Sequence, residues 1–259
     1  MPVAWPLTVA VGLVAGLLSG MFGIGGGLVT TPAIRMLLGQ PELIAVGTPL
    51  PVIIPTALAG ALSYRRAGLV DLRTGVVVGA IGGLFAIAGA RMTTLVGGDV
   101  VLIVTAALIC WTAGDMLYLA YRAPRPEHER IAHGGRAKSW PWLIGLGASA
   151  GLYSGFLGLG GGFVVVPWLI RFFGFPPKRA VATSLVVVCL LAVPGTITHY
   201  LLGNIDVGLA LLLAVGVVPG ALLGARITTV THERVVQASF AALLLFVGLA
   251  LAATELGVL

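Results

Sequence analysis

The chain carries one apolar glycine motif twice, and this repeat limits its fold more than any other feature. Residues 16–27 read GLLSGMFGIGGG, and residues 151–162, which lie 135 positions later, read GLYSGFLGLGGG. A glycine triplet inside an apolar run interrupts a helix, because glycine favours no single backbone conformation. In a membrane, such backbone is tolerated only where protein buries it or where it lines a cavity. The two motifs therefore predict two corresponding helix breaks.

The composition indicates that these breaks lie in a membrane protein. Hydrophobic residues make up 58% of the 259 residues and charged residues only 9%, whereas a soluble domain has about 25% charged residues. At roughly 20 residues per span, the chain has room for about eight to ten helical segments. We therefore expect an all-α polytopic membrane protein with the lipid bilayer as its surroundings.

Several function classes are excluded by what the sequence lacks. The net charge of +6 comes from Lys and Arg in short loops, where they set membrane orientation, so we expect no nucleic-acid partner. The motif at Gly23 and Gly25 lacks the third glycine of a dinucleotide fingerprint, since Leu28 stands there. There is no P-loop lysine, no zinc-protease motif and no nucleophile elbow. We expect neither an enzyme, nor a cofactor, nor a metal site.

The apolar segments divide the chain into two equivalent halves. The offset of 135 residues persists beyond the glycines: Pro32 matches Pro167, and Asp71 matches Asp206. This register indicates an internal duplication, with a first repeat at 1–121, a charged linker at 122–139 and a second repeat at 140–259. The expected apolar segments are 7–38 (broken at 23–27), 44–64, 74–90 and 100–121, then 140–173 (broken at 158–162), 180–202, 207–225 and 235–253.

The relative direction of the halves depends on what the breaks do. If each break is the tip of a helical hairpin followed by three transmembrane helices, the halves are inverted. If each broken stretch crosses once, the halves are parallel. With the linker in the cytoplasm, inversion places every Lys and Arg except Arg35 and Arg91 inside, whereas the parallel arrangement divides them almost equally. Because cytoplasmic loops are rich in Lys and Arg, we expect inverted repeats with both termini extracytoplasmic.

Each break is a candidate binding site for a small anion. A short helix is expected to begin at Leu28 and another at Phe163, and a helix N-terminus offers unpaired N–H groups and about half a positive charge. Two such ends meeting near the midplane would form an electropositive pocket without a buried Lys or Arg, which is costly. The alternative is a hairpin tip that packs without a ligand. The glycines concerned are Gly23, Gly25, Gly26 and Gly27, and Gly158, Gly160, Gly161 and Gly162.

Hydroxyl groups at equivalent positions are candidates to contact the same anion. Ser19 and Ser154 precede the breaks, while Thr48 and the pair Thr183 and Ser184 are expected to open the following helices. Each hydroxyl can donate to an anion, but each can equally cap a helix or bond a carbonyl one turn earlier. Both interpretations stay open from sequence.

Two ionisable residues are candidates for proton coupling. His199 lies near the end of an apolar segment, where it either carries a proton or belongs to the membrane interface. Asp115 lies in the last segment of the first half, where it is either functional, as intramembrane acids often are, or paired with a linker cation.

The doubled motif resembles that of the TauE/SafE-type sulfite exporter permease family. The resemblance includes Pro32 and Pro167 downstream of the glycines and the Ala-x-x-Thr segments that begin at Ala45 and Ala180. It implies a secondary transporter in the cell membrane that exports small sulfur-containing oxyanions, such as sulfite or organosulfonates. A passive anion channel and a non-transporting scaffold are the alternatives. The oligomeric state, including a homo-oligomer, is left open.

Overall fold

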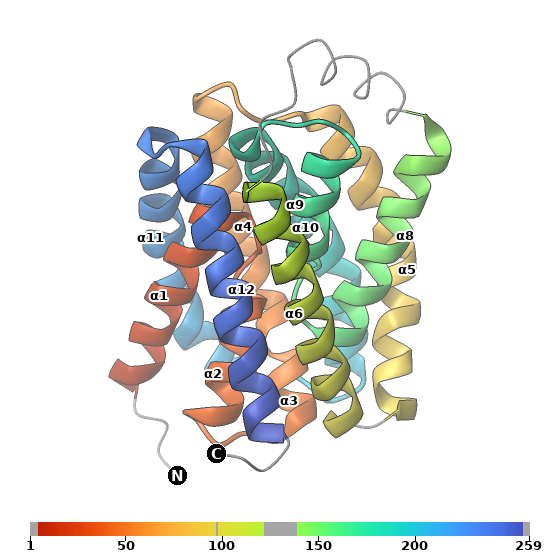
Figure 1. Ribbon diagram of the computed structural model, residues 1–259. Helices are drawn as coiled ribbons and strands as arrows, with labels where there is room; N and C mark the ends of the chain where they lie inside the picture. Colours follow the sequence, from red (N-terminus) through yellow and green to blue (C-terminus); the bar gives the residue numbers. More distant parts are fainter. Residues whose placement is uncertain (1–4, 97, 122–138, 256–259) are drawn as a thin grey trace.

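The structure is a computed structural model that describes residues 5–96, 98–121 and 139–255 as helices and short connections (Figure 1). The helices described in the first half are α1 (Trp5–Phe22), α2 (Gly27–Met36), α3 (Glu42–Gly47), α4 (Pro49–Arg66), α5 (Leu72–Val96) and α6 (Gly98–Tyr121). Those in the second half are α8 (Trp140–Leu157), α9 (Gly162–Arg171), α10 (Pro177–Leu201), α11 (Val207–Val230) and α12 (Glu233–Glu255). The expected all-α architecture is confirmed.

Equivalent helices of the two halves begin at equivalent sequence positions, but one expected helix start is wrong. The span formed by α3 and α4 corresponds to α10, which runs without interruption, so Thr183 and Ser184 lie inside a helix. Thr48 does lie at the junction of α3 and α4. The difference arises at Pro49, which occupies the position of Ser184 and has no N–H with which to continue the preceding helix.

Six segments of the described chain are long and apolar enough to cross a membrane. They are Trp5–Phe22, Glu42–Arg66, Leu72–Thr93, Pro177–Leu201, Val207–Val230 and Glu233–Ala250. Many large apolar side chains on these helices are exposed, among them Leu84, Leu201 and Val230. An apolar exterior of this kind suits contact with lipid.

The two halves interlock through close helix packing. Helix α1 packs along α11, and α8 packs along α5, so each hairpin contacts the opposite half. A Cβ atom on Gly12 would lie 2.5 Å from the carbonyl oxygen of Leu213, and one on Gly147 would lie 2.9 Å from that of Val78. Glycines at four-residue spacing therefore let the backbones approach closely, as small residues do in membrane helix pairs.

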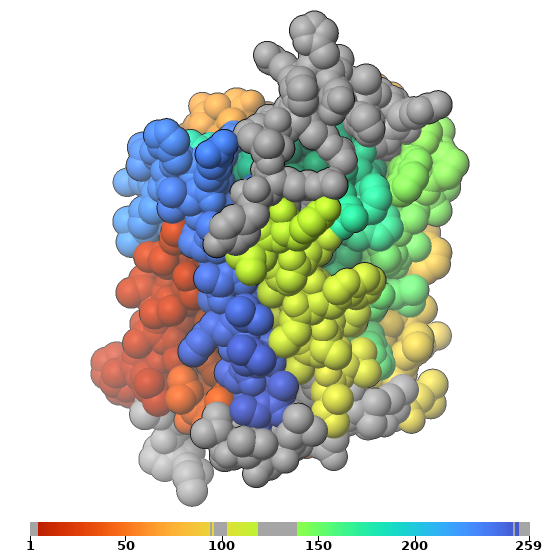
Figure 2. Space-filling view, viewed as in Figure 1, coloured from red at the N-terminus to blue at the C-terminus, as the bar shows by residue number. Residues whose placement is uncertain are grey.

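Equivalent helices run in opposite directions in the structure. In Figure 1, α1 begins and α12 ends at the lower side, whereas α6 ends and α8 begins at the upper side. Helices α6 and α12 pack antiparallel, and Figure 2 shows them side by side over one face of the molecule. This is the relation that inverted repeats require. Residues 122–138 and both chain ends lie outside the described residues, so the sidedness predicted for them stays a prediction.

Candidate functional site

The glycine breaks end α1 and α8 and turn the chain back on itself. Their backbone is left-handed, with φ of 73° at Gly23, 79° at Gly25 and 95° at Gly26, and this conformation disfavours any side chain. The equivalent residues Gly158, Gly160 and Gly161 have φ of 67°, 81° and 71°. Helices α2 and α9 then begin at Gly27 and Gly162, one residue before the expected starts at Leu28 and Phe163.

The two breaks, one from each half, meet inside the molecule. A Cβ atom on Gly27 would lie 2.7 Å from the carbonyl carbon of Leu159, and one on Gly162 would lie 2.5 Å from the carbonyl oxygen of Gly23. The side chain of Ile53, on α4, lies 2.9 Å and 2.8 Å from the Cβ positions of Gly25 and Gly160. The structure therefore places the two helix ends in direct contact.

The first turns of α2 and α9 leave buried N–H groups without acceptors. Val29 is the first residue of α2 to donate to a carbonyl, that of Gly26, at 3.0 Å. In α9, Val164 donates to the carbonyl of Gly161 at 3.0 Å. No side chain caps either helix. Within the described residues, the preceding N–H groups have no acceptor although their residues are buried; they belong to Gly27, Leu28, Gly162 and Phe163.

Two serine hydroxyls lie next to these helix ends, also without partners. Ser19 and Ser154 are fully buried, and within the described residues neither Oγ atom has a hydrogen-bond partner. The Cβ atom of Ser19 lies 3.9 Å from the Cβ position of Gly26, and that of Ser154 lies 3.3 Å from the Cβ position of Gly161. A buried hydroxyl without a partner is costly, so each serine points to a ligand or water at the break.

The two equivalent positions differ in the space around them. The nearest atom to the Cβ position of Gly26 is Cγ2 of Thr56, at 3.8 Å, so the first break has room for a small group. At Gly161, the carbonyl oxygen of Ala150 lies at 2.7 Å and Cδ1 of Leu191 at 3.2 Å. Leu191 stands at the position equivalent to Thr56. The first break is therefore roomier, although Thr56 presents its methyl group there and donates its hydroxyl to the carbonyl of Val52 at 2.6 Å.

Comparison with known proteins identifies the family. The sequence profile described as "Sulfite exporter TauE/SafE" matches residues 8–251, which is nearly the whole chain. The chain belongs to this family. TauE/SafE proteins are membrane transporters and not enzymes.

Three relatives illustrate the similarity of this TauE/SafE chain to other members. The probable membrane transporter protein YunE of Bacillus subtilis is 27% identical over 245 residues, which cover 88% of each chain. The probable membrane transporter protein MJ0441 of Methanocaldococcus jannaschii is 27% identical, with 86% of this chain and 85% of that protein covered. A probable membrane transporter protein of Xylella fastidiosa is 29% identical, with 86% and 84% covered. No solved structure matches the chain.

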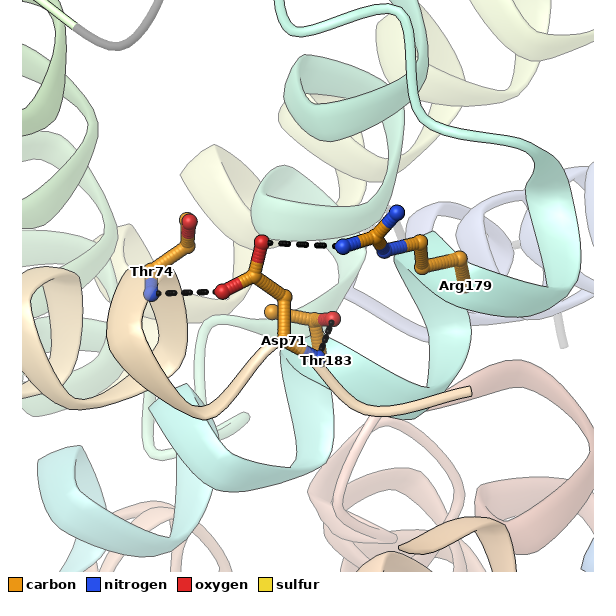
Figure 3. A network of polar contacts seen from close by, with 4 residues as sticks. All are labelled: Asp71, Thr74, Arg179 and Thr183. Atoms are coloured by element: carbon orange, nitrogen blue, oxygen red, sulfur yellow. Dashed lines mark hydrogen bonds and ion pairs between the residues drawn. The ribbon is translucent and has the colours of Figure 1, made fainter. Parts of the chain in front are cut away.

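The threonines predicted for the site are engaged in contacts between the halves of the TauE/SafE chain. Figure 3 shows the contact around Asp71: its N–H donates to Oγ1 of Thr183 at 3.1 Å, and its carboxylate accepts from the N–H of Thr74 at 3.0 Å and from Arg179 at 3.2 Å. We call this group the Asp71 clasp. It ties the start of α5 to α10.

A second clasp, the Asp206 clasp, repeats this arrangement at the equivalent positions. The N–H of Asp206 donates to Oγ1 of Thr48 at 3.1 Å, and its carboxylate accepts from the N–H of Leu209 at 3.0 Å. It ties the start of α11 to the junction of α3 and α4. The position of Arg179 is taken here by Ile44, so this clasp has no equivalent ion pair. Thr48 and Thr183 therefore hold helix starts in this conformation.

Ser184, unlike Thr48 and Thr183, bonds a residue of a break. Its hydroxyl lies 2.7 Å from the carbonyl oxygen of Gly23 and 2.8 Å from that of Val181. The hydroxyl has a single hydrogen to share between these two acceptors. Ser184 thus fixes the first residue of the first break.

His199 and Tyr64 occupy equivalent positions and make equivalent contacts. Nε2 of His199 lies 3.0 Å from the carbonyl oxygen of Gly155, and the hydroxyl of Tyr64 donates to that of Gly20 at 2.7 Å. Both side chains are fully buried, so His199 does not face the membrane interface. Tyr64 was missed as a contact residue from sequence, although the offset of 135 residues maps it onto His199.

Asp115 forms an ion pair with Arg171, near the end of α9. The expected partner was a linker cation, and the linker lies outside the described residues. The pair borders a cavity of about 560 Å³ between α6, α8 and α9. The cavity reaches the first turn of α9, because Phe163 and Val164 line it. Asp115 is therefore paired, and it lies at the edge of the hairpin rather than at the break.

Proposed function

We propose that this protein is a secondary transporter that exports small sulfur-containing oxyanions, such as sulfite or an organosulfonate, across the cell membrane. The observation that carries the proposal is the pair of touching helix ends, where four buried N–H groups and two buried serine hydroxyls lack partners among the described residues. N–H groups at helix ends bind oxyanions without further cations. The family description supports sulfite-like cargo and export.

In the proposed mechanism, the anion binds between the breaks and the halves rock against each other as inverted repeats. Antiparallel equivalent helices and hairpins that enter from opposite sides support this arrangement (Figure 1). Both clasps are formed in the structure. The Asp71 clasp joins the start of α5 to α10, and the Asp206 clasp joins the start of α11 to the start of α4, on the opposite side of the breaks. Opening one clasp while the other stays closed would expose the anion to one side of the membrane.

The proposed orientation places the linker in the cytoplasm and both chain ends outside. It is supported by Arg65, Arg66 and Arg179, which lie where α4 ends and α10 begins, at the side of the molecule where α6 ends and α8 begins (Figure 1). Few cations occur in the connections at the opposite side.

The test is anion flux in proteoliposomes made with Gly26→Leu and Gly161→Leu. A leucine at either glycine needs a strained left-handed backbone and fills the space beside a free serine, so we expect both variants to lose most of the flux. Gly145→Leu is the matched control: this helical glycine has open space around it, and normal flux is expected. Normal flux through folded Gly26→Leu and Gly161→Leu would place the site elsewhere.

The same vesicles separate a carrier from its alternatives. A carrier shows saturable counterflow, in which unlabelled anion on one side accelerates entry of labelled anion. Flux without counterflow would indicate a passive channel. Absence of both flux and ligand-induced stabilisation across sulfite, sulfonates, sulfate and thiosulfate would indicate a non-transporting scaffold.

A further inference from the structure

The interior around the breaks contains no formally charged side chain. Among the described residues, the buried polar side chains are those of Ser and Thr residues, Tyr64, His199, Asn204 and Gln237, and none is Lys, Arg, Asp or Glu. The elements that surround the breaks carry these charged and titratable groups: Arg35 on α2, Glu42 on α3, Tyr64, Arg65 and Arg66 on α4, Tyr153 on α8, Arg171 on α9, and Lys178, Arg179, Cys189, His199 and Tyr200 on α10. Tyr64 and His199 bond carbonyl groups of α1 and α8.

The positive potential at the site therefore comes from the two helix ends. Each helix end is equivalent to about half an elementary charge. Helices α2 and α9 are both 10 residues long and their first residues are in contact with the opposite break. Together they supply at most about one positive charge. Helices α1 and α8 end at the same breaks and contribute the opposite sign, which is reduced because Thr228 and Thr93 donate to the carbonyls of Met21 and Phe156 near these ends. The breaks therefore offer at most about one positive charge, so a dianion leaves at least about one negative charge without compensation.

The cost of removing the anion from water also favours a monoanion over a dianion. The cost of transferring an ion from water into a medium of low dielectric constant rises with the square of its charge. A dianion pays about four times the cost of a monoanion of equal size, and no buried cation is present in the described interior to offset it. Ser19 and Ser154 add neutral donors only.

From this balance we propose that the break site selects singly charged oxyanions, namely sulfonates without a second ionised group and hydrogensulfite, and rejects sulfate, thiosulfate and fully deprotonated sulfite. The inference rests on the proposed function, because it concerns the charge of the anion at that same site. It also assigns a reason for the absence of basic residues at the breaks: an added cation would admit dianions.

The experiment is ligand binding to the full-length wild-type protein in detergent, measured by calorimetry with methanesulfonate, sulfate and sulfite on the acid and the alkaline side of neutrality. We expect methanesulfonate to bind at least about tenfold more tightly than sulfate, which corresponds to 1.4 kcal/mol. Sulfite loses its second proton near neutral pH, so its apparent affinity should fall on the alkaline side. The affinity of methanesulfonate, which carries one charge at both pH values, should stay constant.

Each result decides the question. Equal affinity for sulfate and methanesulfonate would overturn the charge selection and leave an anion transporter in place. If methanesulfonate and sulfite lose affinity equally on the alkaline side, the pH effect belongs to the protein and not to the anion. This result would also overturn the charge selection. Binding of none of the three anions would contradict the proposed function itself.

Discussion

At the scale of single residues, the duplication provides an internal comparison for each side chain at the breaks. The equivalent glycines Gly26 and Gly161 have similar neighbours in sequence but different surroundings in space. The same holds for the equivalent serines Ser19 and Ser154. The Cβ position of Gly26 has 3.8 Å of clearance, whereas that of Gly161 has 2.7 Å. Equivalent residues are therefore not interchangeable, and the difference can be measured.

The roomier first break is expected to carry most of the anion affinity. Ser19→Ala removes a buried hydroxyl beside free N–H groups, and a hydrogen bond to a charged group contributes about 1.5–3 kcal/mol. We expect this variant to weaken methanesulfonate binding roughly ten- to hundredfold. Ser154→Ala, at the crowded break, is the matched comparison and should weaken binding by a smaller factor than Ser19→Ala. Equal losses in calorimetry would indicate that both breaks bind the anion alike.

His199 has two candidate roles, proton coupling and positioning of α8. Replacing it with tyrosine, the residue at the equivalent position 64, distinguishes them. His199→Tyr keeps a side chain able to donate to the carbonyl of Gly155, as Tyr64 does to that of Gly20. A phenol cannot exchange a proton near neutral pH as imidazole does. If His199 couples protons, this variant should retain counterflow but lose transport driven by a pH gradient. Unchanged gradient-driven transport would restrict His199 to positioning α8.

At the scale of helices, the sequence predicted most of the architecture because apolar length and glycine breaks are local signals. Every expected apolar segment contains a helix, and the breaks lie at the expected glycines. The start of α10 at Pro177 was not predicted, because the helix start at the Thr48-Pro49 junction of the first half was extended by analogy to Thr183 and Ser184. Only proline removes the N–H that continues a helix.

Contacts between distant helices could not be read from the pattern. The sequence indicated that Thr48, Thr183 and Ser184 carry useful hydroxyls, yet their acceptors and donors depend on which helices cross. Thr183 meets Asp71, 112 residues away, and Ser184 meets Gly23, 161 residues away. Asp71 and Asp206 occupy matching positions of the repeat, so the sequence did indicate that these two residues of the clasps are equivalent. The pairing itself came only from the fold.

At the scale of the whole molecule, the two halves exchange partners, since each hairpin packs on a helix of the other half. Because of these contacts, the orientation of one half in the membrane determines the orientation of the other. With the linker in the cytoplasm, an inverted repeat then predicts that the connection between α10 and α11 lies outside and that the connection between α11 and α12 lies in the cytoplasm.

That orientation can be tested with single cysteines in a background lacking Cys110 and Cys189. Leu202 and His232 are exposed and lie in these two connections. We expect Leu202→Cys to react with a membrane-impermeant maleimide on intact cells, and His232→Cys to react only after permeabilisation, because the cation-rich side faces the cytoplasm. Parallel repeats give the reverse pattern, since they place the connection after α10 inside and the one after α11 outside. Labelling of both cysteines from outside would fit neither arrangement, and the assignment of the spans would then be wrong.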